Sequence, residues 1–326
     1  MTWMKLALSL GLLIALLGLG YGIVISIAAR KEHQAEQSYP PTGQILTIDG
    51  VPVHAKITGS GPDLVLLHGA SGNIRDFEIS LVPELAKYFR VILFDRPAHG
   101  WTENLPSFRH STKGAPPREQ AKLLIKAAKE LGVQHPLVLG QSYGGTVALA
   151  WALEAPDFLR GLILVSAPSH PWSTALSPLY PINAGRVSGA VSVPLIAALA
   201  NQNRAQPVIE TIFAPQNPPS DYFQRMGVPL SLRRDSLRAN ARQVNTLLDR
   251  VTEMADDYNT IEVPTEILHG TADIIVPLKI HSEPLAQKLP NGHLTVLNGI
   301  GHMPHHSAKD QVIAAIQRAN QRAELP

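Results

Sequence analysis

The sequence contains no cysteine among its 326 residues, which excludes disulfide bonds, thiolate metal ligands and a cysteine nucleophile together. Charged residues are also scarce, because they make up 17% of the chain where soluble proteins usually have roughly 25%. The formal net charge is only +2, so the chain lacks the basic excess with which proteins hold a phosphate backbone, and we expect no nucleic-acid partner. The hydrophobic fraction of 45% is ample for one large domain with an insertion.

Charge is missing altogether from residues 6–29, a run of 24 positions that would extend about 36 Å as a helix. That length spans a bilayer, whereas the apolar region of a cleavable signal peptide covers roughly 7–15 residues. We predict a retained membrane anchor over residues 1–30, with cleavage after Ser26-Ile27-Ala28 as the alternative. Lysine or arginine flanks both ends of the run, so the side of the membrane that holds the domain is not predicted. The oligomeric state is not predicted either.

The chain after the anchor divides into segments of different composition. Residues 31–43 are polar, contain Pro40-Pro41 and lack apolar periodicity, so we interpret them as a linker. Residues 44–48 and 53–57 flank Asp49-Gly50 and predict an antiparallel hairpin. Apolar strands then alternate with helices: strands are expected at 64–67, 91–94, 137–139, 162–165, 265–268 and 294–297, and helices at 118–131 and 310–321 among others. This alternation predicts an α/β fold with a mostly parallel central sheet covered on both faces.

The alternation stops in a stretch of about ninety residues, which is too long for a loop. We predict a helical cap at 170–259, inserted between two parts of one core at 44–169 and 260–326. The cap contains a basic section at 230–251 with five arginines: Arg233, Arg234, Arg238, Arg242 and Arg250. We interpret these arginines as a solvated helix face with local ion pairs, and steering of an anionic substrate is the alternative.

The motif with the clearest chemistry is Gly140-Gln141-Ser142-Tyr143-Gly144, which lies between a strand-like apolar run and a helix-like one. A serine flanked by glycines at a strand-to-helix turn can hold its hydroxyl clear of the sheet, where a base can take its proton. We therefore predict that Ser142 is a nucleophile, with an ordinary helix N-cap as the alternative.

A serine hydroxyl is a poor nucleophile at neutral pH, so it requires a histidine as base and an acid that orients the imidazole. Asp273 follows one predicted strand and His302 follows the last. Because the carboxyl ends of parallel strands share one edge of a sheet, both residues should lie beside Ser142. We predict that Asp273 is the acid and His302 the base.

Each of these two assignments has competitors in the sequence. Glu266 or Asp256 could supply the acid, and His305 or His306 the base, although only His302 directly follows the Gly-Ile-Gly turn. The three histidines also suggest a metal site, but we expect no carboxylate to accompany them, and Pro304 interrupts helical spacing. We expect neither a metal nor an organic cofactor.

Together the motifs resemble the α/β-hydrolase superfamily, from about residue 44 to the C-terminus apart from the cap. Besides the segments of Ser142, Asp273 and Gly301-His302, the resemblance rests on His68-Gly69-Ala70-Ser71-Gly72 and Asp95-Arg96-Pro97-Ala98-His99-Gly100. It implies that the backbone N–H groups of Ala70 and Tyr143 form an oxyanion hole. Ala98 departs from the pattern, because related sequences usually carry glycine there, and this questions the geometry of the local turn.

The resemblance also implies an activity: a serine hydrolase that cleaves an ester or related acyl compound through an acyl-enzyme. A serine nucleophile argues against the epoxide hydrolase and dehalogenase branches, which use aspartate. Carbon–carbon bond hydrolases, aminopeptidases and cofactor-free peroxidases keep the serine triad, so these activities stay open, as does a non-catalytic receptor for a small ligand. The expected partners are a small acyl substrate and a membrane that holds the N-terminal helix.

Overall fold

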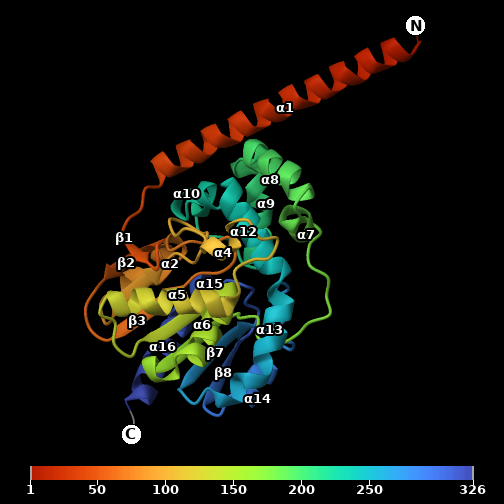
Figure 1. Ribbon diagram of the computed structural model, residues 1–326. Helices are drawn as coiled ribbons and strands as arrows, with labels where there is room; N and C mark the ends of the chain where they lie inside the picture. Colours follow the sequence, from red (N-terminus) through yellow and green to blue (C-terminus); the bar gives the residue numbers. More distant parts are fainter. Residues whose placement is uncertain (1, 325–326) are drawn as a thin grey trace.

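The computed structural model describes residues 2–324 and is built around one eight-stranded sheet (Figure 1). The strands follow the order β1-β2-β4-β3-β5-β6-β7-β8 across the sheet. Their bounds are β1 Gln44–Ile48, β2 Val51–Thr58, β3 Asp63–Leu67, β4 Arg90–Phe94, β5 Leu137–Gln141, β6 Gly161–Val165, β7 Thr265–Gly270 and β8 Gly292–Leu297. Only β2 pairs antiparallel, with β1 and β4, so the predicted mostly parallel sheet is confirmed. Residues 1, 325 and 326, at the ends of the predicted anchor and core, lie outside the described residues.

Helices cover both faces of the sheet, which is why its central strands are apolar at successive positions. Neighbouring side chains of β6 belong to two different hydrophobic clusters, one on each face of the sheet. Leu164 belongs to the cluster that also contains residues of α5 (Pro117–Glu130) and α6 (Tyr143–Glu154). Val165 joins the other, which contains residues of α2 (Arg75–Ser80), α3 (Val82–Leu85) and α16 (Lys309–Ala323). The shorter helices of the core are α4 Pro106–Arg109, η1 Pro156–Phe158, α14 Ser282–Lys288 and α15 Pro304–Ser307.

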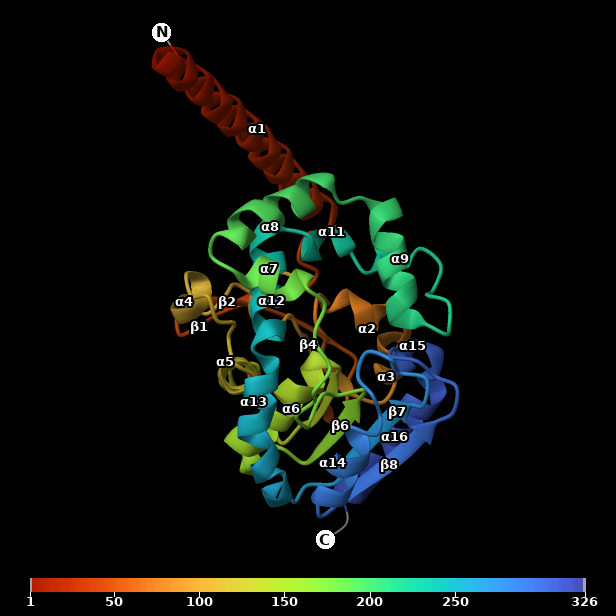
Figure 2. The same cartoon turned by 90° about the vertical axis from the view of Figure 1, so that its right-hand side faces the viewer.

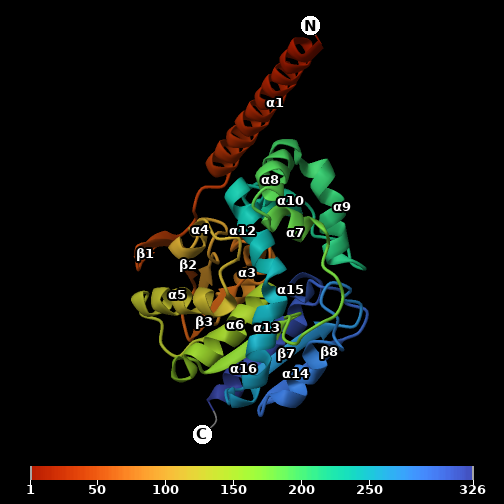
Figure 3. The ribbon, with the colours of Figure 1, turned by 45° about the vertical axis from the view of Figure 1, so that its right-hand side comes forward.

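Seven α-helices of the described chain lie between β6 and β7, where the sequence predicts a helical cap. Their bounds are α7 Leu179–Ala184, α8 Ser188–Leu199, α9 Gln202–Phe213, α10 Tyr222–Arg225, α11 Val228–Ser231, α12 Arg234–Asn245 and α13 Leu247–Ala255, followed by η2 Asp256–Thr260. We call α7–α12 the inserted helices. Figures 2 and 3 show them above the sheet, whereas α13 runs down beside α6. Val251 and Met254 of α13 belong to the core cluster, so this last helix packs as part of the core.

The first helix, α1, is continuous over Thr2–Ser38, so residues 31–38 of the predicted linker are helical. Residues 3–20 project free of the domain, while Ala28 and Ala35 are buried against it. The linker prediction relied on missing apolar periodicity, but the polar residues have distant partners: Glu32 accepts two side-chain hydrogen bonds from Arg234, at 2.8 and 2.7 Å. The helix is long and apolar enough to cross a membrane, a property that N-terminal signal sequences share.

The five arginines of residues 230–251 form fewer local ion pairs than the sequence suggested. Arg234 and Arg233 pair with Glu32 and Glu36 of α1, about two hundred positions away in the chain. Within the described part of the chain, Arg250 of α13 is the one of these five that forms a local ion pair, with Glu253 one turn later. Arg233 and Arg234 therefore join the inserted helices to α1, whereas Arg238 donates to carbonyl oxygens that follow α7.

The turn at Ala98 has the unusual geometry that the missing glycine suggested. Ala98 has a φ of +69° and lies in the left-handed region. A residue with a Cβ adopts that conformation at a cost of about 1–2 kcal/mol. Replacing Ala98 with glycine is expected to raise the free energy of unfolding by roughly 0.5–1 kcal/mol, after the added flexibility of the unfolded chain is subtracted. Urea unfolding measures this change. The matched control is Ala121→Gly inside α5, where glycine should destabilise by about 1 kcal/mol, and equal losses in both variants would contradict the prediction.

Candidate active site

Ser142 lies at the sharp turn between β5 and α6, with φ +50° and ψ −123°. Glycine is required on both sides of it. A Cβ added at Gly140 would lie 2.2 Å from the carbonyl oxygen of Gly144, and one added at Gly144 would lie 2.1 Å from that of Leu67. The Ser142 hydroxyl makes no capping hydrogen bond to α6. The local sequence therefore forces a strained turn that leaves the hydroxyl available for another partner.

That partner is His302, whose Nε2 lies 3.0 Å from Ser142 Oγ. The other ring nitrogen of His302, Nδ1, lies 2.8 Å from Asp273 Oδ2. Ser142 follows β5, Asp273 follows β7 and His302 follows β8, so three strand ends of one parallel sheet bring the side chains together. All three side chains are buried. This arrangement can pass a proton from the hydroxyl to the imidazole while the carboxylate fixes the ring.

The carboxylate of Asp273 is held by four donors. Its Oδ1 accepts hydrogen bonds from the backbone N–H groups of Ile275 and Val276, each at 2.9 Å. Its Oδ2 also lies 3.2 Å from Nε2 of His269. Burial raises the pKa of Asp273, but the charge of His302 and hydrogen bonds from His269 and His302 outweigh it and hold the pKa below its usual range. Asp273 is therefore ionised at neutral pH, and His269, which the sequence did not single out as a partner, helps to position it.

The competing acids and bases lie in other environments. Glu266 is the second residue of β7 and binds Arg318 and Arg322 at 2.9 and 2.8 Å. Asp256 is exposed beside Lys288. His305 and His306 both bind Asp76 of α2 instead of approaching Ser142.

The expectation that no carboxylate accompanies these two histidines is wrong. His305 Nε2 lies 3.0 Å from Asp76 Oδ2, His306 Nε2 lies 2.9 Å from Oδ1, and the Tyr222 hydroxyl donates to Oδ1 at 2.7 Å. Burial raises the pKa of Asp76, but the two histidines hold it well below its usual range. Burial also lowers the pKa of His305 to about 4.

The side chains of Asp76, His305 and His306 place their possible metal-ligand atoms within 4.8 Å of one another. A histidine that binds a metal ordinarily donates from its second ring nitrogen, yet Nδ1 of His305 is buried without a hydrogen-bond partner among residues 2–324. The hydrogen bonds of Asp76 to Tyr222, His305 and His306 instead make this cluster a structural link between helices. It joins α10 of the inserted helices to α2 and α15 of the core.

The backbone N–H groups of Ala70 and Tyr143 lie on the two loops that meet at Ser142. A Cβ added at Gly69 would lie 3.2 Å from Cβ of Ser142, so the loop after β3 passes directly beside the serine. Within residues 2–324, neither amide donates a hydrogen bond to another group. Two free donors next to the hydroxyl are what an oxyanion hole requires.

The buried, positively charged side chain of Arg96 supports the loop after β3. The guanidinium of Arg96 donates to the carbonyl oxygens of His68 and Gly69, at 2.7 and 2.9 Å, and lies over the Tyr143 ring at 4.5 Å. The Gly69 carbonyl and the Ala70 N–H belong to one peptide group, so Arg96 fixes the direction of that N–H. Burial lowers the pKa of Arg96 to about 10, and the side chain stays charged at neutral pH. Arg96 belongs to the Asp95–Gly100 motif of the sequence, but the spacing of residues in that motif does not indicate a contact with the loop after β3.

Polar residues of the inserted segment also hold core loops near the serine. Gln216 donates to the Gly299 carbonyl at 2.8 Å and accepts from the Gly301 N–H at 2.9 Å, directly before His302. Asn240 accepts from the Ser71 N–H at 2.8 Å. Gln243 donates to the Pro97 carbonyl at 3.0 Å. The inserted helices and the loop between α9 and α10 are thus hydrogen-bonded to three loops of the core.

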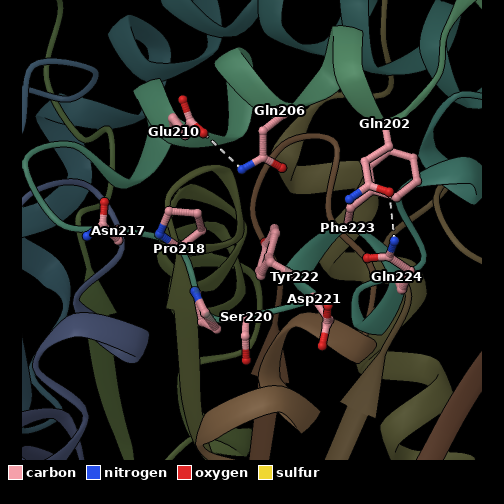
Figure 4. A pocket seen from close by; sticks show the side chains of 11 residues that line it. Gln202, Gln206, Glu210, Asn217, Pro218, Ser220, Asp221, Tyr222, Phe223 and Gln224 are labelled. Carbon is pink, nitrogen blue, oxygen red and sulfur yellow. Dashed lines mark hydrogen bonds between the residues drawn. The ribbon is translucent and has the colours of Figure 1, made fainter.

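A pocket of about 390 Å³ lies elsewhere, between α9, α10 and the loop that joins them (Figure 4). Its lining is mostly polar, and Gln206 and Glu210, one turn apart on α9, are hydrogen-bonded to each other on one side of it. Neither Ser142, Asp273 nor His302 lines this pocket. The candidate active site therefore rests on the geometry of its side chains and not on this cavity.

Comparison with known proteins gives a consistent result. A family profile described as alpha/beta hydrolase fold matches residues 62–309. The chain is 28% identical over 257 residues to a pimeloyl-(acyl-carrier protein) methyl ester esterase of Vibrio campbellii, covering 77% of this chain and 92% of that protein. It is 24% identical over 254 residues to a 2-hydroxy-6-oxononadienedioate/2-hydroxy-6-oxononatrienedioate hydrolase of Cupriavidus pinatubonensis, covering 77% and 84%. The structure of a thermophilic esterase from Thermogutta terrifontis matches with a TM-score of 0.70 at 24% identity, covering 87% of this chain and 100% of that one.

Proposed function

The chain belongs to the alpha/beta hydrolase fold family, and from this membership we propose that it is a serine hydrolase that cleaves an ester or related acyl compound. The observation that carries the proposal is the continuous contact from Ser142 Oγ through His302 to Asp273, with spacings of 3.0 and 2.8 Å. A non-catalytic receptor would have no use for a strained serine aligned with an imidazole and a carboxylate.

In the proposed reaction, Ser142 Oγ attacks the substrate carbonyl carbon while His302 Nε2 accepts the hydroxyl proton. Asp273 stabilises the imidazolium that forms. The N–H groups of Ala70 and Tyr143 donate to the oxyanion, and removal of one such donor typically costs about 3–4 kcal/mol of transition-state stabilisation. His302 then protonates the leaving group, and water, activated by the same histidine, hydrolyses the acyl-enzyme and restores the serine.

A second candidate function is the hydrolysis of a carbon–carbon bond on the same residues, because one relative described above is named for a substrate of that kind. We rank ester cleavage first because the esterase relative has the higher identity and the chain covers more of its length. A panel of p-nitrophenyl esters of graded acyl length and vinylogous diketones separates the two. Turnover of the diketones alone would reverse the ranking.

We further propose that α1 is a retained membrane anchor. Its candidate cleavage site ends at Ala28, which is fully buried in a cluster with Ala197 and Ala198 of α8. Cleavage there would require this packed part of the helix to leave the domain. Extraction of the full chain from membranes by detergent, but not by high salt or carbonate, is the expected behaviour, and release of a shortened chain into the soluble fraction would contradict it.

A fluorophosphonate probe tests the proposed nucleophile. We expect the full chain to be labelled and the label to map by mass spectrometry to the peptide that contains Ser142. Ser166 supplies an internal comparison, because it also has a positive φ at a strand end and is buried, but its hydroxyl has no hydrogen-bond partner among the described residues. Labelling of Ser166 instead, or persistent labelling in Ser142→Ala, would overturn the assignment.

A further inference from the structure

Helix α1 passes over α8 at an angle, and two side-chain hydrogen bonds join the two helices (Figure 1). The Tyr21 hydroxyl donates to the Ala190 carbonyl at 2.9 Å, and Lys31 Nζ donates to the Ala200 carbonyl at 2.6 Å. Both pairs are 169 positions apart, so the two helices run in the same general direction between these two contacts. The start of α8 therefore lies at the level of Tyr21, on the side toward the free half of α1.

Aromatic residues mark both ends of the free half of α1. Trp3 and Tyr21 are 18 positions apart in the helix, a length of about 27 Å, which is close to the roughly 30 Å of a bilayer hydrocarbon core. The residues between them are exposed. Tryptophan and tyrosine are enriched where a membrane helix crosses the two interfaces. If α1 spans a bilayer, Tyr21 marks the interface nearer the domain.

An apolar surface lies at this same level, at the junction of α7 and α8. We define the α7–α8 corner as Ile182, Arg186, Val187 and Val191, of which Val187 is 80% exposed. From Val187 the exposed apolar side chains continue along α8 at every fourth position, at Val191, Leu195 and Leu199, so they share one face of the helix. A helix that is apolar on its packed and its exposed faces is typical of contact with lipid or another protein.

The charges carried by α7 and α8 themselves favour lipid. The sequence has no aspartate or glutamate from residue 158 to residue 209, a stretch that includes all of α7 and α8. Arg186, at the corner itself, is exposed. Exposed apolar side chains beside an arginine, with no acidic residue near them in the sequence, suit an interface between acyl chains and anionic headgroups.

We propose that the α7–α8 corner contacts the bilayer beside Tyr21, with Val187 at the acyl–headgroup boundary and Arg186 among the headgroups. This inference rests on the proposed anchor, and it makes the inserted helices a second, direct membrane contact of the domain. The occupant of the corner is the lipid of the leaflet nearer the domain.

The absence of cysteine allows a direct test with single-cysteine variants of the full chain. Val187→Cys carries an environment-sensitive fluorophore at the corner, Leu12→Cys carries it in the middle of the free half of α1, and Val296→Cys is a matched exposed valine on β8. Each protein is reconstituted in vesicles of phosphatidylcholine and phosphatidylglycerol, with and without brominated acyl chains that quench fluorescence on contact. Fluorophosphonate labelling of the same samples shows that the domain is folded and tests the proposed nucleophile independently.

We expect brominated lipid to reduce the fluorescence at positions 187 and 12 and to leave position 296 unchanged. Quenching at 12 together with no quenching at 187 would overturn the corner contact while leaving the anchor in place. An absence of quenching at 12 would remove the anchor and the inference with it. A label at 187 that is shielded from water without quenching, and that becomes exposed as lipid is added at constant protein, would show that a second copy of the chain covers the corner, which also overturns the proposal.

Discussion

Replacing Asp273 with asparagine is expected to lower kcat for ester hydrolysis by about four orders of magnitude. Asp273 Oδ2 accepts a hydrogen bond from His302 Nδ1, and Nε2 of a second histidine, His269, lies 3.2 Å from the same oxygen. An amide has only one acceptor atom, and backbone N–H groups of Ile275 and Val276 already bind Oδ1. The amide oxygen would satisfy those two N–H groups, which turns its NH₂ group toward His302 and favours the tautomer that cannot accept the proton of Ser142.

The matched control for this prediction is Asp256→Asn, which changes the rival acid in the sequence by the same two atoms. Asp256 is exposed and lies 3.4 Å from Lys288 at the surface, so kcat should stay within about twofold of the wild-type value. Steady-state kinetics with a soluble p-nitrophenyl ester compares the two variants. A large loss in Asp256→Asn with normal activity in Asp273→Asn would exchange their roles.

Replacing Arg96 with methionine is expected to lower the free energy of unfolding by about 3–5 kcal/mol. Methionine fills similar space, but it leaves the carbonyl oxygen of His68 and the side-chain oxygens of Gln120 and Gln243 without their donor. The Gly69 carbonyl loses one donor and keeps His68 Nδ1. Each buried acceptor left unpaired costs about 1–3 kcal/mol. Part of that loss is recovered, because the desolvated guanidinium is no longer buried. Urea unfolding of the full chain in detergent measures the difference.

Two further variants show whether the loss comes from the hydrogen bonds of Arg96. Arg109→Met removes an exposed arginine that pairs with Glu103, and it should change stability by less than about 1 kcal/mol. Arg96→Lys keeps the charge but cannot bind the carbonyls of His68 and Gly69 with a planar fork. We expect intermediate stability from it. Equal stability of Arg96→Met and Arg109→Met would show that the buried guanidinium is not required.

The strands and the side chains that meet at Ser142 could be predicted from the sequence because their signals are local. A fully buried strand needs an unbroken apolar run, as at 162–165, and a parallel sheet brings residues that follow its strands to one edge. Ser142, Asp273 and His302 needed only that rule and their neighbouring glycines. Their distances were not predictable, but their common edge was.

Other features depend on contacts between residues far apart in the chain, which no local pattern encodes. Asp76 precedes His305 by 229 positions, so the sequence near the histidines gave no sign of this carboxylate. The helical segment 31–38 was interpreted as a linker for the same reason, because Glu32 and Glu36 become informative only beside Arg234 and Arg233. Arg96 was visible in a motif, yet its contact with the Gly69 carbonyl requires the folded loop.

The hydrogen bonds of Gln216, Asn240 and Gln243 to the core restrict how a substrate can enter. If the inserted helices swung away as one rigid lid, Gln216 would release the segment that leads into His302, and Asn240 would release the loop that carries Ala70. The open form would therefore lose the alignment needed for attack on the carbonyl. For the proposed hydrolase we therefore expect a substrate to enter by local displacement of a few side chains or one loop, with α12 staying in place. Turnover should then depend little on a large movement of the inserted helices away from the core. A covalent tether between α12 and the core should therefore leave turnover unchanged.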